Sequence, residues 1–157
     1  MADNRLGPII EAAVNKLVTT AAESGYFPAG VASVEPKSAP PPGGLYYATW
    51  IESIKPVPER SGLPVTSARV EMIGRMYLPM LTDPQDQIDT DLAVAASFML
   101  AQLTGDFGVT GAWIDLLGAH GEALNTAFGY VALDKSMCRM ADTCVPFICD
   151  DVFDQEV

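Results

Sequence analysis

The sequence predicts an α+β fold: a single domain with two main helices packed on a mixed or antiparallel sheet. Two segments carry apolar residues at intervals of three and four, the spacing of a helix with one buried face. Elsewhere, short runs of branched and aromatic residues alternate with glycines, prolines and polar turns, which is typical of strands. The length of 157 residues fits one domain, so we expect 1–157 to form a single unit.

The first predicted helix covers residues 4–24. Asp3 or Asn4 can cap its start, and Gly25 is placed to end it. Its apolar residues would form one buried stripe along the helix. The stripe consists of Leu6, Ile9, Ile10, Ala13, Val14, Leu17, Val18 and Ala21.

Residues 35–44 are predicted to form an exposed loop, called the proline-rich arm below. Its three consecutive prolines, Pro40, Pro41 and Pro42, favour polyproline II and exclude a helix or a central strand. The arm is too short to separate two domains, so we place it within the one domain.

Two strands are expected next, over residues 45–54 and 65–77. The first is rich in aromatic and branched residues. The connection 55–64 contains prolines and a glycine, so the strands are expected to pair as a long hairpin with a projecting, proline-stiffened tip. In the second strand, alternation places Ala68, Val70 and Met72 on one face, and Arg69, Glu71, Ile73 and Arg75 on the other.

The second predicted helix covers residues 83–104. Asp83 can cap it, Pro84 suits the first helical position, and Gly105 can stop it. Asp83, Asp86, Asp89 and Asp91 lie near its start, where the helix dipole favours acids. The expected buried stripe is Ile88, Leu92, Ala95, Ala96, Met99 and Leu103. Val94, Phe98 and Leu100 widen the apolar surface, so we expect burial on more than one side.

The last third of the chain is predicted to complete the sheet. Residues 108–117 contain a strand or extended segment. Residues 130–133 and 137–147 are expected to form a closing hairpin around a turn at 134–136. Residues 150–157 are expected to be an acidic tail.

The net charge of −11, from 9 basic and 20 acidic side chains, argues against a grip on DNA or on an anionic membrane. The basic residues are spread singly along the chain, whereas phosphate binding needs them clustered. No signal peptide or membrane-spanning run is visible. The odd number of cysteines, 3, then indicates reduced thiols in a cytosolic protein.

The sequence contains no recognisable catalytic motif, and we expect no catalytic residue, cofactor or metal site. His120 lies in a glycine-rich turn without the context of a nucleophile elbow. Cys138, Cys144 and Cys149 are spaced more like buried thiols than like zinc ligands, and on a strand the first two would share a face. A small hydrolase-like enzyme using His120 or these cysteines is the alternative from a different class.

Two other groups of residues have structural explanations. The acids near residue 83 do not match a calcium-binding loop, and the glycines at 43–44 and 105–111 do not match a phosphate-binding loop. Tyr46, Tyr47 and Trp50 lack the surrounding basic residues of a base-stacking platform. We interpret these aromatic residues as core packing or as part of a subunit interface.

The order of these segments resembles that of the tail terminator proteins of long-tailed phages, also called tail-completion or neck proteins. The resemblance covers nearly the whole chain, and its pieces are turn and packing signals. It begins with the helix ending near Tyr26 and Phe27, the proline-rich arm and the strand around Trp50. It continues through segments 66–70, 75–77, 88–89, 105–107, 114–118 and 129–131.

The resemblance implies a ring-forming subunit, commonly in six copies, that belongs to the virion neck and is assembled in the host cytoplasm. Such a ring caps the completed tail tube and joins it to the head connector or stopper, and genomic DNA passes through its lumen without specific binding. The expected partners are therefore further copies of the chain, the major tail tube protein and the connector. A head-completion or stopper protein, or a tube protein, is the nearby alternative.

The contact residues expected under this resemblance lie in two exposed, stiff segments. Stiff loops lose little conformational entropy on docking. We therefore expect Pro40, Pro41 and Pro42 of the proline-rich arm, and Arg60 and Leu63 of the hairpin tip, to contact neighbouring subunits or the tube. The acidic balance leads us to expect acids along the lumen, although the sequence does not identify which ones.

Overall fold

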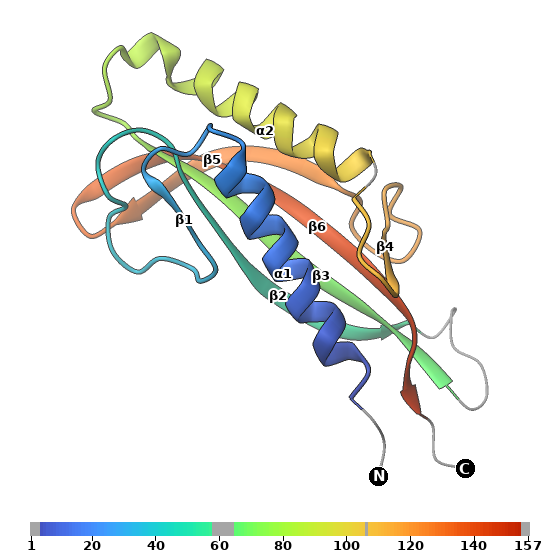
Figure 1. The fold of residues 1–157 in the computed structure, drawn as a ribbon. Helices are drawn as coiled ribbons and strands as arrows, with labels where there is room; N and C mark the ends of the chain where they lie inside the picture. The colour runs from blue at the N-terminus through green and yellow to red at the C-terminus, as the bar shows by residue number, and fades with distance from the viewer. Residues whose placement is uncertain (1–3, 58–64, 106, 155–157) are drawn as a thin grey trace.

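The computed structural model describes residues 4–57, 65–105 and 107–154 and shows the predicted α+β domain. Two helices lie on one side of a sheet of 6 strands, and they diverge across it in Figure 1. The strand order is β1-β2-β3-β6-β4, and β5 also pairs with β6. The sheet is mixed because β1 is parallel to β2, whereas every other pair is antiparallel.

The first helix, α1 (Leu6–Glu23), matches the sequence prediction closely. Asn4 Oδ1 accepts a hydrogen bond of 2.9 Å from the N–H of Gly7, so Asn4 satisfies one donor of the first turn. Gly25 follows the helix with φ +79°, a conformation that glycine adopts without a steric penalty. The chain then forms β1 (Gly30–Ala32), a short edge strand that the sequence did not predict.

The long hairpin is confirmed as β2 (Tyr46–Val57) and β3 (Val65–Pro79), which pair from Tyr46↔Tyr77 to Val57↔Ser67. Residues 55–57 of the predicted connection belong to β2 instead, and 58–64 lie outside the described residues. The register shifts between Ile51 and Ser53, which marks a β-bulge. As predicted, Ala68, Val70 and Met72 point into the core beneath the helices.

The second helix, α2 (Ile88–Thr104), begins later than the sequence predicted. Pro84 has ψ 138°, an extended conformation, so neither Asp83 nor Pro84 takes the predicted role at the helix start. A 3₁₀ turn, Gln85–Gln87, leads into the helix instead. Its buried residues are those of the predicted stripe. Of the three residues expected to widen it, Val94 is exposed, whereas Phe98 and Leu100 are half-buried, so the expected broader burial is found only in part.

Of the last three strands, two are longer than predicted and one is shorter. Between 108 and 117 only β4 (Ala112–Ile114) is a strand, because the chain turns at Asp115. The closing hairpin is β5 (Asn125–Leu133) and β6 (Ser136–Asp154), around a turn in which Asp134 has φ 54°.

The expected acidic tail at 150–157 is wrong for residues 150–154, which belong to β6. Asp154 and Phe153 pair with Val65 and Thr66 at the start of β3, so the long strand β3 needs β6 along its whole length. Val152 is buried in the core. The pairing of backbone groups and the burial of Val152 therefore outweigh the local density of acids.

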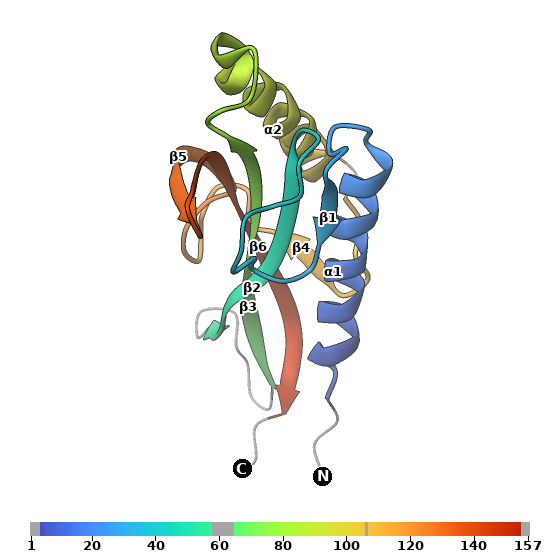
Figure 2. The same ribbon diagram turned by 90° about the vertical axis from the view of Figure 1, so that its left-hand side faces the viewer.

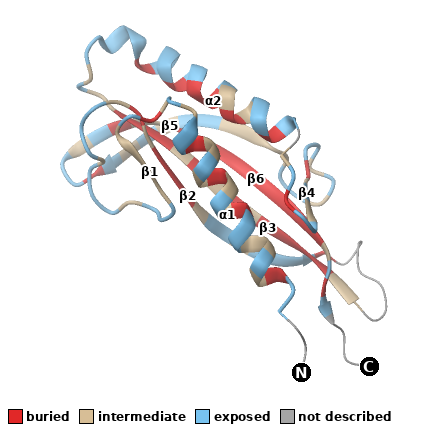
Figure 3. Ribbon diagram, in the orientation of Figure 1, coloured by how far each residue is buried: buried red, intermediate tan, exposed pale blue. Residues whose placement is uncertain are grey.

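The main core lies between the helices and the sheet, and Figure 3 shows buried residues along β3, β6 and the inner helix faces. Figure 2, the view turned by 90°, shows the sheet curling so that β5 bends away from the helices. A smaller apolar cluster of Ala48, Tyr77, Leu133 and Cys138 is buried at this curled end. Within the described residues, neither helix has the length and hydropathy needed to cross a membrane.

Candidate subunit interface

Exposed apolar side chains lie on two strands at opposite edges of the sheet. On β2, Ile51 and Ile54 are 39% and 48% exposed, and on β5, Phe128 and Tyr130 are 43% and 61% exposed. Large apolar groups exposed on neighbouring positions are more typical of an interaction surface than scattered ones. These two edges are therefore the first candidates for contacts with other subunits.

The outer edge of β5 has no strand beside it among the described residues, because β5 pairs only with β6. Its 9 residues, NTAFGYVAL, contain no charged residue and no proline. Monomeric proteins usually protect an edge strand with charges, prolines or bulges, because unpaired backbone groups invite pairing with another chain. Within the described structure, β5 thus lacks the usual protection of a sheet edge.

Arg139 holds the aromatic side chains of β5 against α2. Its guanidinium lies 4.5 Å from the ring centroid of Tyr130 and 5.7 Å from that of Phe128. Arg139 Nε donates a 2.8 Å hydrogen bond to Asp89 Oδ1 on α2, and this bond raises the pKa of the guanidinium. The cation–π contacts give both rings a defined position although they remain exposed.

The outer edge of β2 is covered by β1 only at residues 46–48. Beyond Ala48 no described strand pairs with this edge. Ile51 and Ile54 are three positions apart, so simple alternation would place them on opposite faces. The bulge changes the alternation: Ile51 pairs with Met72 and Ile54 pairs with Val70, and both partners face the helices.

Apart from the two sheet edges, the structure contains a buried ion pair that fixes the loop of residues 115–122. Arg69 on β3 is only 2% exposed, and its Nη1 donates a 2.7 Å hydrogen bond to Asp115 Oδ2. Its Nε donates to Glu71 Oε1 at 2.8 Å, and its Nη2 donates to the Glu122 carbonyl. A buried guanidinium needs such acceptors, and here the loop supplies two of them.

The Asp115 carboxylate, which accepts from Arg69, also binds backbone groups of its own loop. Asp115 accepts hydrogen bonds from the backbone N–H groups of Ala119, at 2.9 Å, and His120, at 3.0 Å. Burial opposes its ionisation, but these N–H groups and Arg69 outweigh that effect and lower the pKa of Asp115. The loop is thereby held rigidly on the sheet by interactions that the sequence analysis did not identify.

This fixed loop presents apolar residues to solvent. Leu117 is 92% exposed and Leu116 is 42% exposed, and Leu116 lines a shallow groove with Leu103 and Phe107 at the end of α2. A rigid apolar residue loses little entropy when it is covered by a partner. The loop is therefore a further candidate contact surface.

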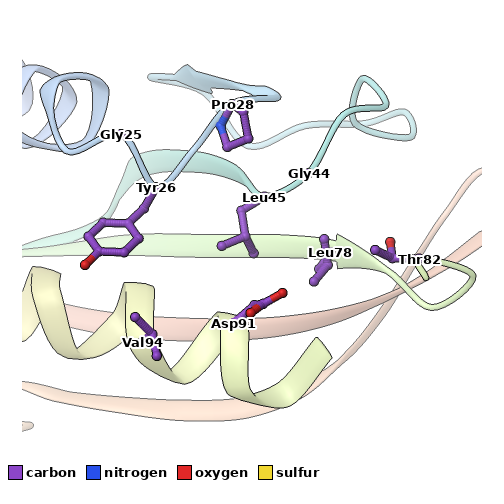
Figure 4. Close-up of a pocket in the computed structure, with 9 residues that line it drawn as sticks. All are labelled: Gly25, Tyr26, Pro28, Gly44, Leu45, Leu78, Thr82, Asp91 and Val94. Carbon is purple, nitrogen blue, oxygen red and sulfur yellow. The ribbon is translucent and has the colours of Figure 1, made fainter. Parts of the chain in front are cut away.

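An apolar groove of about 360 Å³ lies at the other end of α2 (Figure 4). Figure 4 shows Tyr26, Leu45 and Leu78 on its walls, with Val94 and Asp91 of α2 opposite. The ring of Tyr26 also contacts that of Phe98, with centroids 5.2 Å apart. A small number of polar groups at the rim of an apolar groove is common in binding sites, but nothing in this groove identifies a ligand.

The contact residues predicted from the sequence are only partly described. Pro41 and Pro42 are exposed and Pro40 is half-buried, as expected for an exposed arm. The arm is tied to the β5–β6 turn, because the Ala39 N–H donates a 3.1 Å hydrogen bond to Asp134 Oδ2. Arg60 and Leu63 lie outside the described residues, so their predicted contacts stay a prediction.

His120 and the cysteines lie in separate surroundings. The His120 ring packs edge-on against Trp113, with centroids 6.3 Å apart. The three thiols are free and buried, and burial raises the pKa of Cys144 and of Cys149 to about 11 in each case. Cys138 joins the small apolar cluster, whereas Cys149 joins the main core.

The aromatic residues near the start of β2 are divided between the two faces of the sheet. Tyr47 is buried in the main core, with its ring 5.1 Å from that of Phe27. Tyr46 and Trp50 pack on the small cluster. Beside them the Arg75 guanidinium lies 5.3 Å from the centroid of the Trp50 ring and donates to Asp142, including a 2.8 Å hydrogen bond from Nη2 to Oδ2. Packing therefore accounts for these aromatic residues.

The acids near the start of α2 do not converge on a common point. Asp89 is paired with Arg139, and Asp91 lies at the rim of the apolar groove. In the described part of the chain, no three His, Cys, Asp or Glu side chains are grouped so that they would hold a metal ion. The described surface is thus defined by its apolar edges, its fixed loop and its ion pairs.

No protein-family model matches this chain, and a comparison with curated proteins finds no match.

Proposed function

We propose that this chain is a structural subunit of the neck of a long-tailed phage, of the tail terminator type. Copies of it form a ring that caps the completed tail tube and joins it to the head connector, with DNA passing through the lumen. The observation that carries the proposal is the exposure of apolar side chains at both lateral edges of one sheet. Two different edges allow head-to-tail contacts, which give a ring where the rotation from copy to copy closes.

The tail terminator assignment itself is supported by the order of sequence segments described above. It is a resemblance in turns and packing signals, and it agrees with an α+β domain whose exposed apolar groups call for partners. The nearby alternative, a head-completion or stopper protein or a tube protein, shares the same class of contacts. A distinction between them requires the protein's position on the tail.

The charge distribution supports passage of DNA without specific binding. Arg69, Arg75 and Arg139 are all paired with carboxylates, so they offer little net charge to phosphates. The net charge of −11 adds a repulsive background. Nucleic-acid binding needs clustered basic side chains that neutralise phosphates, and this chain would instead let DNA slide.

The first test is native mass spectrometry and negative-stain imaging of the purified protein, alone and mixed with tail tubes. We expect rings seated at one end of each tube. A protein that ignores tubes but binds the head connector would be a head-side adaptor. A protein that binds neither would contradict a role in the neck.

A second test separates assembly from catalysis. Replacing His120 with alanine should leave ring formation and phage assembly unchanged, since its ring contacts Trp113 at the surface of the fixed loop. Loss of function in a folded His120→Ala protein would instead favour the small-enzyme alternative.

A further inference from the structure

We propose that neighbouring copies join by pairing β5 of one copy with the outer edge of β2 of the next, residues 49–56. This inference rests on the proposed ring and names the surface that builds it. The joint would extend one sheet from copy to copy and would cover Phe128 and Tyr130 with Ile51 and Ile54. Four independent features of the structure lead to this pairing.

The first feature is the absence of a described neighbour at both edges. β5 pairs only with β6, and β2 has β1 beside it only as far as Ala48. The outward-facing backbone groups of both segments therefore have no strand partner within the described ranges. Such edges are templates for another strand. β5 carries no charge or proline to prevent pairing, whereas the β2 segment contains the bulge and Pro56, so β5 is the less protected of the two edges.

The second feature is strand direction. β2, β3, β6 and β5 are neighbours in this order, and each adjacent pair is antiparallel. If a second copy continues the sheet in the same orientation, its β2 arrives antiparallel to the β5 that it meets. The alternation of strand direction is then preserved across the joint, which is the ordinary geometry of a sheet.

The third feature is that the exposed apolar side chains of both edges face the same side. Phe128 pairs with Ala141, which is in the core beneath the helices, and Tyr130 pairs with Arg139, which reaches α2. Ile51 and Ile54 also lie on the helix side, because the bulge in β2 restores the correct face. Side chains on the same face of adjacent strands pack against one another and stabilise the pairing.

The fourth feature is charge. Copies that each carry −11 repel one another, so a joint between them should be poor in acids. β5 contains no charged residue, and the edge of β2 at 49–56 contains one acid, Glu52, and one base, Lys55. The two edges thus bring no net charge into contact. An uncharged strand edge with two exposed aromatic rings fits a second copy better than it fits nucleic acid.

Pairwise cross-linking between two single-cysteine additions tests this joint. Ile51→Cys protein is mixed with Phe128→Cys protein, with and without tail tubes, and treated with a short bifunctional maleimide. The native thiols are buried, so the added thiols at exposed positions should react first. We expect a cross-linked dimer containing one chain of each variant, and longer ladders from the double variant.

One control variant and two alternative outcomes make the experiment decisive. Ala12→Cys, which places a thiol at an exposed position of α1 and on neither edge strand, should not cross-link to Phe128→Cys above background. If Phe128→Cys cross-links to itself instead, β5 pairs with β5 in a two-fold dimer, and the proposed joint is wrong. If no pair cross-links while rings still seat on tubes, the joint is also wrong, but the neck function stands.

A charge substitution provides an independent readout. Tyr130→Lys should leave the fold intact, because this side chain is exposed, but it should raise the concentration needed for assembly by about tenfold or more. Ala12→Lys, at an exposed position of α1, adds the same charge away from the edge strands and should assemble like the unmodified protein. Cross-linking of Ile51→Cys to Phe128→Cys without any binding to tubes would support the joint and contradict the neck function.

Discussion

Arg69 shows how one buried charge can define the shape of a surface. It lies on the strand face that is turned away from the helices, where an arginine would ordinarily reach solvent. Here the loop of residues 115–122 covers it and supplies both a carboxylate and a carbonyl. Gly121 makes this possible, because a Cβ at that position would come within 2.7 Å of the Arg69 guanidinium carbon.

Replacing Asp115 with alanine should destabilise the folded protein by about 3 kcal/mol, because the change leaves a buried guanidinium short of a charged partner. It also removes the acceptor of the Ala119 and His120 N–H groups. Urea unfolding, followed by circular dichroism, measures the change. Glu11→Ala, which removes an exposed carboxylate on α1, should change the stability by less than about 0.5 kcal/mol. Equal losses in the two variants would contradict the role given to Asp115.

The sequence analysis could not predict which residues surround a buried charge such as Arg69. Alternation along β3 correctly placed Arg69 opposite Ala68, Val70 and Met72, but it said nothing of what lies over that face. The partner, Asp115, is 46 positions away, and only the tertiary fold brings the two together. The exposure of Leu117 has the same origin, since a run of leucines is ordinarily interpreted as core.

At the scale of elements, the periodic segments were predicted most reliably. The apolar spacing of α1 and α2 identified their buried faces, because that spacing directly reflects which side meets the sheet. Element ends were less accurate. The start of α2 was placed too early because Asp83 and Pro84 have the composition of a helix start, yet Pro84 is extended in the structure.

Shortening a side chain to alanine should affect stability differently on the two faces of α2. Met99 is 1% exposed in the main core, so Met99→Ala should cost about 2–5 kcal/mol through lost burial and a residual cavity. Val94 is 46% exposed, so Val94→Ala should cost less than about 1 kcal/mol. Thermal or urea unfolding of the two variants tests this directly. A large loss on Val94→Ala would mean that a neighbouring copy buries this side of the helix during the measurement.

The strands at the sheet edges show why pairing is harder to predict than periodicity. The expected acidic tail and the short predicted closing hairpin both underestimated β6, whose 19 residues pair with three other strands. Local composition around 150–154 is acidic, but the start of β3 requires a partner strand there. The edges of β2 and β5 that have no described strand beside them follow from this same pairing pattern, so they too became visible only in the folded chain.

At the scale of the whole molecule, shape and charge point to the same kind of activity. One face of the sheet is covered by helices and holds the main core. The lateral edges carry exposed apolar groups, and three arginines are neutralised by carboxylates. In the proposed ring, such a molecule would gain free energy by burying its edges against further copies and would gain little from contact with phosphates.

If DNA passes through the lumen without specific binding, the ring itself should have little affinity for DNA. Assembled rings should not retain duplex DNA in a gel-shift measurement at 50–150 mM salt, because counterion release requires clustered, unpaired basic side chains. The chain carries 9 basic against 20 acidic residues, and assembly multiplies that imbalance. Arg75→Ala is a useful comparison, since it frees the Asp142 carboxylate and should make retention weaker still. Retention of DNA that falls steeply as salt increases would show that assembly creates a basic surface. The lumen would then bind DNA, which would contradict the prediction.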